Sequence, residues 1–282
     1  MIRFLLLAAA LGLAGPGAAP AAPVAPAPSA KPFVPTRFSV AAQGKGPDVI
    51  LIPGLAGSRD VWKATVAAVP GYRYHLVQVA GFADTPARGN ARGDVVAPLA
   101  EELARYIKSN RLHRPAIVGH SMGGTVAMMV GARHPSLAGK VMVVDMLPQP
   151  AGIVGGDAAG MRGLADSLRD LSATPGGRRL VESAIRLFGN PDSGADPDVV
   201  ARATHELALT DLSRELPRIA APLTVVYASL DPSRRAADDR RYRAAYASKR
   251  GAKLVRIDDS SHMIMHDQPA RFRAELKAFL AN

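Results

Sequence analysis

The segment Gly119-His120-Ser121-Met122-Gly123 constrains the fold more than any other part of the chain. It sets a serine between two glycines, after an apolar run at 115–118 and before a stretch with helical spacing. A serine on a tight turn between a strand and a helix adopts a strained backbone, and side chains two positions away would collide with the neighbouring strand and helix. The segment therefore predicts a nucleophile elbow with Ser121 at its tip.

The residues on both sides support this prediction. Residues 114–118 read as a short buried strand, and residues 122–133 are rich in Ala, Met and Val at helical spacing. A helix that begins directly after Ser121 would point unpaired N–H groups and its positive dipole end at the serine. This arrangement favours a developing oxyanion.

A nucleophilic serine needs a base and an acid that orients the base. In folds with this elbow both follow the serine, the acid first and the histidine later. Asp231 follows the β-rich run 222–228, and His262 follows a second run at 252–257 and its polar loop. The loops beyond the carboxyl ends of strands are where α/β folds carry their chemistry. We therefore expect Ser121, Asp231 and His262 to form a catalytic triad.

Two of these positions have rivals. Asp145 ends the apolar run 141–144 and is a competing acid, and Asp231, which precedes Pro232, could simply start a turn. Asp231 is preferred because Asp145 lies on the strand directly after the serine, whereas the expected order places the acid later. His266 is a second candidate base, but His262 directly follows the polar loop. No cluster with metal-ligand spacing is evident, so no metal is expected.

Strand-like and helix-like runs alternate along the rest of the chain. Strands are expected at 48–52 and 72–79, and helices at 59–68 and 95–109. This predicts a mostly parallel central sheet flanked by helices, with the core in residues 31–146 and 217–282. Residues 147–216 change to helical segments broken by glycine and proline, which predicts a helical cap over the site. The alternative is that these segments pack only as an outer helical layer.

The N-terminal residues 1–30 differ from the rest in composition. Arg3 precedes an apolar run at 4–14 that is too short to span a membrane, and residues 15–30 are rich in Ala and Pro. We expect a signal peptide and linker, a periplasmic or secreted protein, and no stable membrane anchor after cleavage. The chain has 282 residues and no cysteine, so no disulfide staples the fold. Its net charge is +11, but no nucleic-acid-binding motif is evident, and no nucleic-acid partner is expected.

Together these segments resemble the serine hydrolases of the α/β-hydrolase superfamily, in the capped subgroup that includes carboxylesterases, carbon–carbon bond hydrolases and cofactor-free haloperoxidases. The resemblance covers nearly all of the chain after residue 30. It is carried by residues 50–58, the elbow, the Asp231 loop and residues 262–269. It implies an oxyanion hole made by the backbone N–H groups of Leu55 and Met122. Relatives commonly have His-Gly where this chain has Pro53-Gly54, but the implied donor is on Leu55.

The resemblance implies acyl transfer without a cofactor. His262 would take the Ser121 proton, Ser121 would attack the carbonyl of a small-molecule carboxylic ester, and Asp231 would stabilise the imidazolium. A serine at the elbow excludes the dehalogenases and epoxide hydrolases of this superfamily, which use aspartate there. Carbon–carbon hydrolysis or perhydrolysis by a haloperoxidase-type enzyme on the same scaffold remains an alternative, as does a catalytically silent binding protein.

Overall fold

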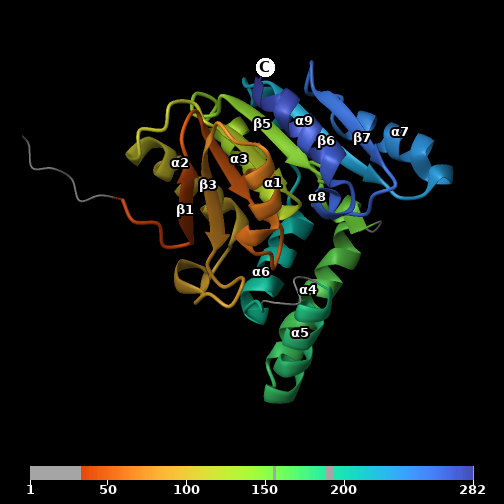
Figure 1. Ribbon diagram of the computed structural model, residues 1–282. Helices are drawn as coiled ribbons and strands as arrows, with labels where there is room; N and C mark the ends of the chain where they lie inside the picture. The colour runs from red at the N-terminus through yellow and green to blue at the C-terminus, as the bar shows by residue number, and fades with distance from the viewer. Residues whose placement is uncertain (1–32, 155–156, 189–193, 282) are drawn as a thin grey trace, which may run out of the picture. The chain divides into compact units, whose positions relative to one another are not determined.

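The computed structural model describes residues 33–154, 157–188 and 194–281 (Figure 1). The signal peptide and linker expected at residues 1–30 lie outside this range. None of the helices described combines the length and the apolarity needed to cross a bilayer.

The described residues form one seven-stranded sheet in the order β1-β3-β2-β4-β5-β6-β7. β1 pairs antiparallel with β3, and all other neighbours are parallel. Central strands of such a sheet are covered on both faces and therefore read as continuous apolar runs. The strands are β1 (Phe38–Gly44), β2 (Asp48–Ile52), β3 (Arg73–Val79), β4 (Ala116–His120), β5 (Lys140–Val144), β6 (Leu223–Ser229) and β7 (Lys253–Asp258).

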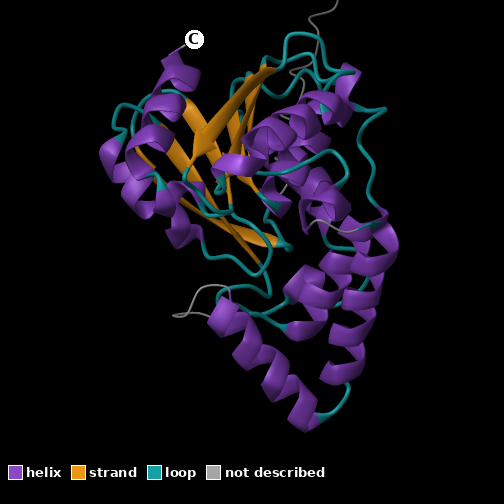
Figure 2. Cartoon of the chain, turned by 90° about the vertical axis from the view of Figure 1, so that its right-hand side faces the viewer, coloured by secondary structure: helices purple, strands orange, loops and turns teal. Residues whose placement is uncertain are grey.

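Helices cover both faces of the sheet (Figures 1 and 2). On one face, α1 (Lys63–Ala68), α8 (Ile264–Asp267) and α9 (Pro269–Ala281) pack in a core around Trp62 and Phe272. On the other face, α2 (Val96–Ser109), α3 (Met122–Arg133) and α7 (Arg235–Ala245) pack in a second core. The mostly parallel sheet flanked by helices that the sequence predicts is confirmed. β1, for which no strand is predicted, extends the sheet by one antiparallel edge strand.

Among the described residues between β5 and β6 are three α-helices, in the range where the sequence predicts a cap. They are α4 (Ala158–Ser172), α5 (Pro175–Phe188) and α6 (Pro197–Leu209). α4 and α5 lie side by side, and α4 also packs along α6 (Figure 1).

A carboxylate ties α6 to the rest of the structure. Glu206 accepts hydrogen bonds from the backbone N–H groups of Val95, Val96 and Ala97, at 2.6–2.7 Å. These N–H groups belong to the first turn of α2, where no intrahelical acceptor exists and a negative charge is favoured. Glu206 therefore caps α2 and fixes the position of α6 beside it.

Candidate active site

Ser121 lies on a sharp turn between β4 and α3. Its backbone has φ 53° and ψ −124°, a strained combination for a residue with a side chain. The turn is held by a 2.9 Å hydrogen bond from the Ser121 N–H to the carbonyl oxygen of Val144, at the end of β5. The nucleophile elbow predicted from the sequence thus has the expected backbone geometry.

The two glycines that flank the turn are sterically required. A Cβ on Gly119 would overlap the carbonyl oxygen of Gly123, and a Cβ on Gly123 would overlap the carbonyl oxygens of Ile52 and Pro53. All of these atoms belong to backbone that cannot rotate out of the way. Any side chain at either position would therefore displace β4, α3 or the segment after β2.

The segment after β2 lies directly against the elbow. A Cβ placed on Gly54 would stand 3.1 Å from the Ser121 Cβ and 3.1 Å from the His120 Nδ1. Leu55, the next residue, lines the same cavity as Ser121. Met122 is the first residue of α3, so its N–H has no acceptor one turn earlier in the helix. Leu55 thus lines the cavity of the serine and Met122 directly follows the serine, and their role as oxyanion donors stays a prediction.

The structure pairs His262 with Asp145, not with Asp231. The His262 Nδ1 lies 2.7 Å from the Asp145 Oδ2, although 117 residues separate them in the sequence. Asp231 is exposed, and its carboxylate accepts a hydrogen bond of 2.8 Å from the Ser233 N–H at the start of a 3₁₀ helix. This is the turn-forming role that the sequence left open for an aspartate before proline. The expected pairing of Asp231 with His262 is thus not found, and the carboxylate that the structure places at this histidine is that of Asp145.

Asp145 follows the last residue of β5 in a left-handed conformation, with φ 48°. Its side chain is only 9% exposed, and three donors satisfy it. Its Oδ1 accepts from the Ala228 N–H at 3.0 Å and from the Tyr242 hydroxyl at 2.8 Å, while Oδ2 faces His262. Burial, followed by the Asp145 charge, raises the pKa of Tyr242 well above its usual value, which keeps this hydroxyl a donor at neutral pH.

His120 is a second histidine of the site, and no role for it was predicted from the sequence. Its Nε2–H donates to the carbonyl oxygen of His262 at 2.9 Å, and the two rings lie 4.7 Å apart between centroids. Burial, with a smaller effect from the charge of His262, lowers the pKa of His120 to about 3. A neutral ring therefore supports the His262 backbone. Its only signal in the sequence is its place beside Ser121.

Ser121, Asp145 and His262 line one cavity of about 650 Å³. Its volume lies within the range of small-molecule sites, about 300–1,000 Å³. Across residues 33–154, 157–188 and 194–281, no hydrogen bond joins Ser121 to the His262 ring, as is common for catalytic pairs before substrate binds. His266, the rival base, is exposed on α8 and does not line this cavity. The other lining residues are Leu55, Met146, Met161, Leu207, Ala228, Ser229, Leu230, Asp231, Arg234, Asp238, Arg241, Tyr242, Ser260 and Ser261.

Comparison with known proteins assigns the chain to a family. Residues 49–275 match the alpha/beta hydrolase family. The chain belongs to this family. The resemblance stated from the sequence is therefore confirmed.

Two curated relatives of this alpha/beta hydrolase are pimeloyl-[acyl-carrier protein] methyl ester esterases. The protein from Vibrio atlanticus is 27% identical over 213 residues, which cover 67% of this chain and 78% of the relative. The protein from Vibrio cholerae is 26% identical over 261 residues, which cover 84% of this chain and 92% of the relative.

Solved structures share the fold of this alpha/beta hydrolase. The enol-lactonase from Burkholderia xenovorans LB400 aligns with a TM-score of 0.63 and 21% identity, covering 87% of this chain and 96% of that chain. A thermophilic esterase from Thermogutta terrifontis aligns with a TM-score of 0.67 and 18% identity, covering 86% and 93%.

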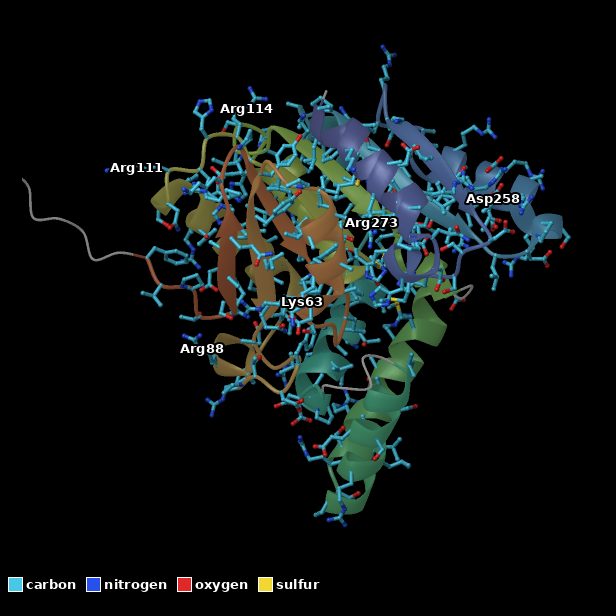
Figure 3. The ribbon with its side chains drawn as sticks, in the orientation of Figure 1. Lys63, Arg88, Arg111, Arg114, Asp258 and Arg273 are labelled. Atoms are coloured by element: carbon cyan, nitrogen blue, oxygen red, sulfur yellow. The ribbon has the colours of Figure 1, made fainter. Side chains whose placement is uncertain are left out.

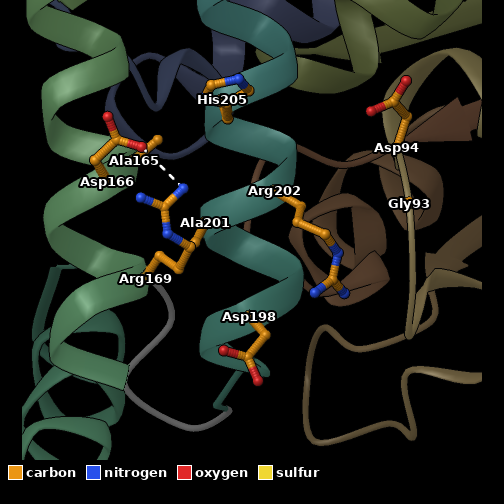
Figure 4. A pocket seen from close by; sticks show the side chains of 9 residues that line it. All are labelled: Gly93, Asp94, Ala165, Asp166, Arg169, Asp198, Ala201, Arg202 and His205. Carbon is orange, nitrogen blue, oxygen red and sulfur yellow. Dashed lines mark ion pairs between the residues drawn. The ribbon is translucent and has the colours of Figure 1, made fainter. Parts of the chain in front are cut away.

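A second cavity of this hydrolase, of about 300 Å³, lies between α4, α6 and the loop before α2 (Figure 4). Its charged lining is partly paired within α4, where Arg169 lies 3.0 Å from Asp166. Ser121, Asp145 and His262 do not contribute to it. It is separate from the candidate active site.

Proposed function

We propose that this hydrolase cleaves carboxylic esters through an acyl-enzyme on Ser121, with His262 as the base and Asp145 as the acid. The proposal rests above all on the 2.7 Å contact between Asp145 and His262, because this contact directs the histidine into the cavity that Ser121 also lines. The methyl ester esterases among the curated relatives support a carboxylic ester as the substrate.

In the first half of the reaction, Ser121 Oγ attacks the ester carbonyl carbon and its proton moves to the His262 Nε2. The carbonyl oxygen becomes negatively charged and is stabilised by the backbone N–H groups of Leu55 and Met122. The bond to the alcohol oxygen then breaks, and His262 donates the proton to that oxygen. The products of this half are the free alcohol and an acyl group on Ser121.

In the second half, a water molecule gives a proton to His262 and attacks the acyl carbonyl carbon. The bond to Ser121 Oγ breaks and the serine recovers its proton, which releases the carboxylic acid. Asp145 stays ionised throughout in this scheme. It holds the Nδ1–H of His262, so that Nε2 is the basic nitrogen, and it stabilises the imidazolium in both halves.

Labelling with a fluorophosphonate tests the nucleophile. The full-length protein should gain one adduct, on Ser121, and should hydrolyse p-nitrophenyl esters in the series from acetate to decanoate. Ser121→Ala should gain no adduct and lose about 10⁵- to 10⁶-fold in kcat. An adduct on a different residue, or near-normal turnover by Ser121→Ala, would contradict the assignment. An adduct on Ser121 without ester turnover would retain the nucleophile and reject the ester substrate.

Export is a further part of the proposal. Its support is the sequence alone, with Arg3 ahead of the apolar run at 4–14 and the Ala/Pro-rich stretch after it. Fractionation of bacteria that express the full chain should place the protein outside the cytoplasm, with a mass that shows loss of about 20–30 N-terminal residues. An uncleaved protein in the cytoplasm would reject this part without affecting the catalytic assignment.

A further inference from the structure

One face of α7 forms a charged wall of the active-site cavity. Asp238 and Arg241 lie three residues apart on α7, and Arg234 directly precedes this helix, four residues before Asp238; all three line the cavity. Tyr242, the donor to Asp145, adjoins them on this face. The wall therefore presents two guanidinium groups to the cavity that contains Ser121.

The carboxylates of this cavity already have donors. Asp145 accepts from Ala228, Tyr242 and His262. Asp238 accepts from the Ser229 hydroxyl at 2.8 Å, and Asp231 accepts from the Ser233 N–H at 2.8 Å.

The two arginines of the wall differ from their neighbours. Arg235 lies 2.8 Å from Asp259, and Arg256 lies 2.5 Å from Asp258, which is labelled in Figure 3. Within the part of the chain that the structure describes, neither Arg234 nor Arg241 has a carboxylate oxygen within 4.0 Å. The guanidinium groups of Arg234 and Arg241 can therefore bind an anionic ligand.

Arg241 is the better placed of the two because it is half-buried, whereas Arg234 is exposed at the rim. The Arg241 Nη2 would lie 3.6 Å from a Cβ on Gly152, so the side chain reaches from α7 to the segment before α4. Its positive charge also opposes the rise in the Tyr242 pKa that burial and Asp145 cause, which shows that it lies within electrostatic reach of this network.

A half-buried guanidinium without a carboxylate partner favours an anionic ligand, and its planar fork matches a carboxylate. The other walls of the cavity contain Leu55, Met146, Met161 and Leu207, which suit a short hydrocarbon chain. We propose that the enzyme prefers esters whose acyl part ends in a carboxylate, and that Arg241 binds this carboxylate while Ser121 attacks the ester. This inference rests on the proposed ester hydrolysis.

Two pairs of substrates with equal carbon number test the preference. They are the p-nitrophenyl monoester of glutaric acid with p-nitrophenyl pentanoate, and the p-nitrophenyl monoester of adipic acid with p-nitrophenyl hexanoate. Wild-type kcat/KM should be higher for the carboxylate member of at least one pair. Arg241→Gln should lower the ratio of the two kcat/KM values by about 10- to 100-fold, the usual effect of a hydrogen bond to a charged group. Arg241→Lys should lower this ratio less than Arg241→Gln does.

Arg240→Gln is the matched control, because Arg240 is exposed on the same helix and does not line the cavity. It should leave the ratio unchanged. A wild-type preference for the neutral esters in both pairs, or an equal change of the ratio in both glutamine variants, would overturn the inference while leaving ester hydrolysis standing.

A binding measurement separates the two proposals if no ester is turned over. Free glutarate should slow the labelling of wild-type Ser121 by a fluorophosphonate, and should slow it much less in Arg241→Gln. Equal protection of both proteins, or none, would refute the carboxylate site. If wild type turns over no ester but glutarate still slows its labelling more than that of Arg241→Gln, ester hydrolysis is rejected and the carboxylate site is retained.

Discussion

Tyr242 donates its hydroxyl hydrogen to the Asp145 Oδ1, the carboxylate oxygen that does not face His262. The Ala228 N–H donates to the same oxygen. Both contacts restrict rotation of the carboxylate and thereby fix the direction in which it holds His262. In the proposed mechanism Tyr242 is therefore a positioning residue for the base His262, and we expect it to contact no substrate atom.

Tyr242→Phe should lower kcat by about 3- to 10-fold, because one of three hydrogen bonds to Asp145 is lost, and KM should change little. Steady-state kinetics on a neutral p-nitrophenyl ester measures this split. Tyr246→Phe is the control, since Tyr246 is equally buried but donates to the Met146 carbonyl oxygen. Both variants should lose a similar amount of stability. Only Tyr242→Phe should lose kcat. Equal kcat losses would attribute the effect to packing.

Asp145→Asn should lower kcat by about 10³- to 10⁴-fold, because an amide that accepts and donates no longer selects the required tautomer of His262. Asp231→Asn should change kcat less than about threefold, since its contact is to a local N–H at the protein surface. Turnover of both variants on one ester measures the ranking. The reverse ranking would return the acid role to Asp231.

His120 should make the folded state less stable in acid. Its pKa is about 3 in the folded protein and about 6.5 when unfolded, so between these values the unfolded chain binds a proton that the folded chain does not. The stability associated with neutral His120 is complete above pH 6.5 and is lost as the pH falls toward 3. The contribution of this single group to the free energy of unfolding should fall by up to about 1.4 kcal/mol per pH unit.

Denaturant unfolding of wild type and His120→Gln at several pH values measures this slope. The variant should be less stable than wild type at pH 7.5. The difference between their free energies of unfolding should become smaller as the pH falls. His113→Gln is the control, because His113 is exposed. A gap that does not depend on pH would show that His120 is not kept neutral by burial.

Alanine at the two glycines Gly123 and Gly163 should have opposite effects. Gly123→Ala would overlap the carbonyl oxygens of Ile52 and Pro53 and should destabilise the protein by more than about 2 kcal/mol. Gly163 lies within α4 with nothing near the added methyl, so Gly163→Ala should stabilise by about 0.5–1 kcal/mol. Thermal unfolding of both variants checks the signs. Tolerance of Gly123→Ala would contradict the tight approach of α3 to β2.

The elbow could be predicted from sequence because its requirements are local. The glycines, the strand before Ser121 and the helix after it all lie within about twenty residues. The carboxylate that contacts His262 could not be predicted in this way. β5 and β6 are neighbours in the sheet, so Asp145 and Asp231 both follow strands at the same edge. The two aspartates differ in their local structure. Asp145 has a left-handed backbone, and the Asp231 carboxylate accepts a hydrogen bond from the Ser233 N–H.

His120 and Tyr242 were not predicted for a related reason. Each acts through a hydrogen bond to a residue far away in the chain, to the His262 backbone in one case and to Asp145 in the other. No spacing in the sequence reports such contacts. β1 was missed because its outer residues are exposed and its pattern is weakly apolar, as expected of an edge strand.

In the proposed mechanism the acid lies at the end of β5, so the loop 230–234 takes no part in proton transfer, although Leu230, Asp231 and Arg234 line the cavity. In a chain whose acid follows β6, changes to this loop would endanger turnover. Here the loop can be randomised in a library at little risk to the reaction, and new substrate preferences can be selected from it. The position of a single carboxylate thus makes this one loop the natural starting point for directed evolution of the enzyme.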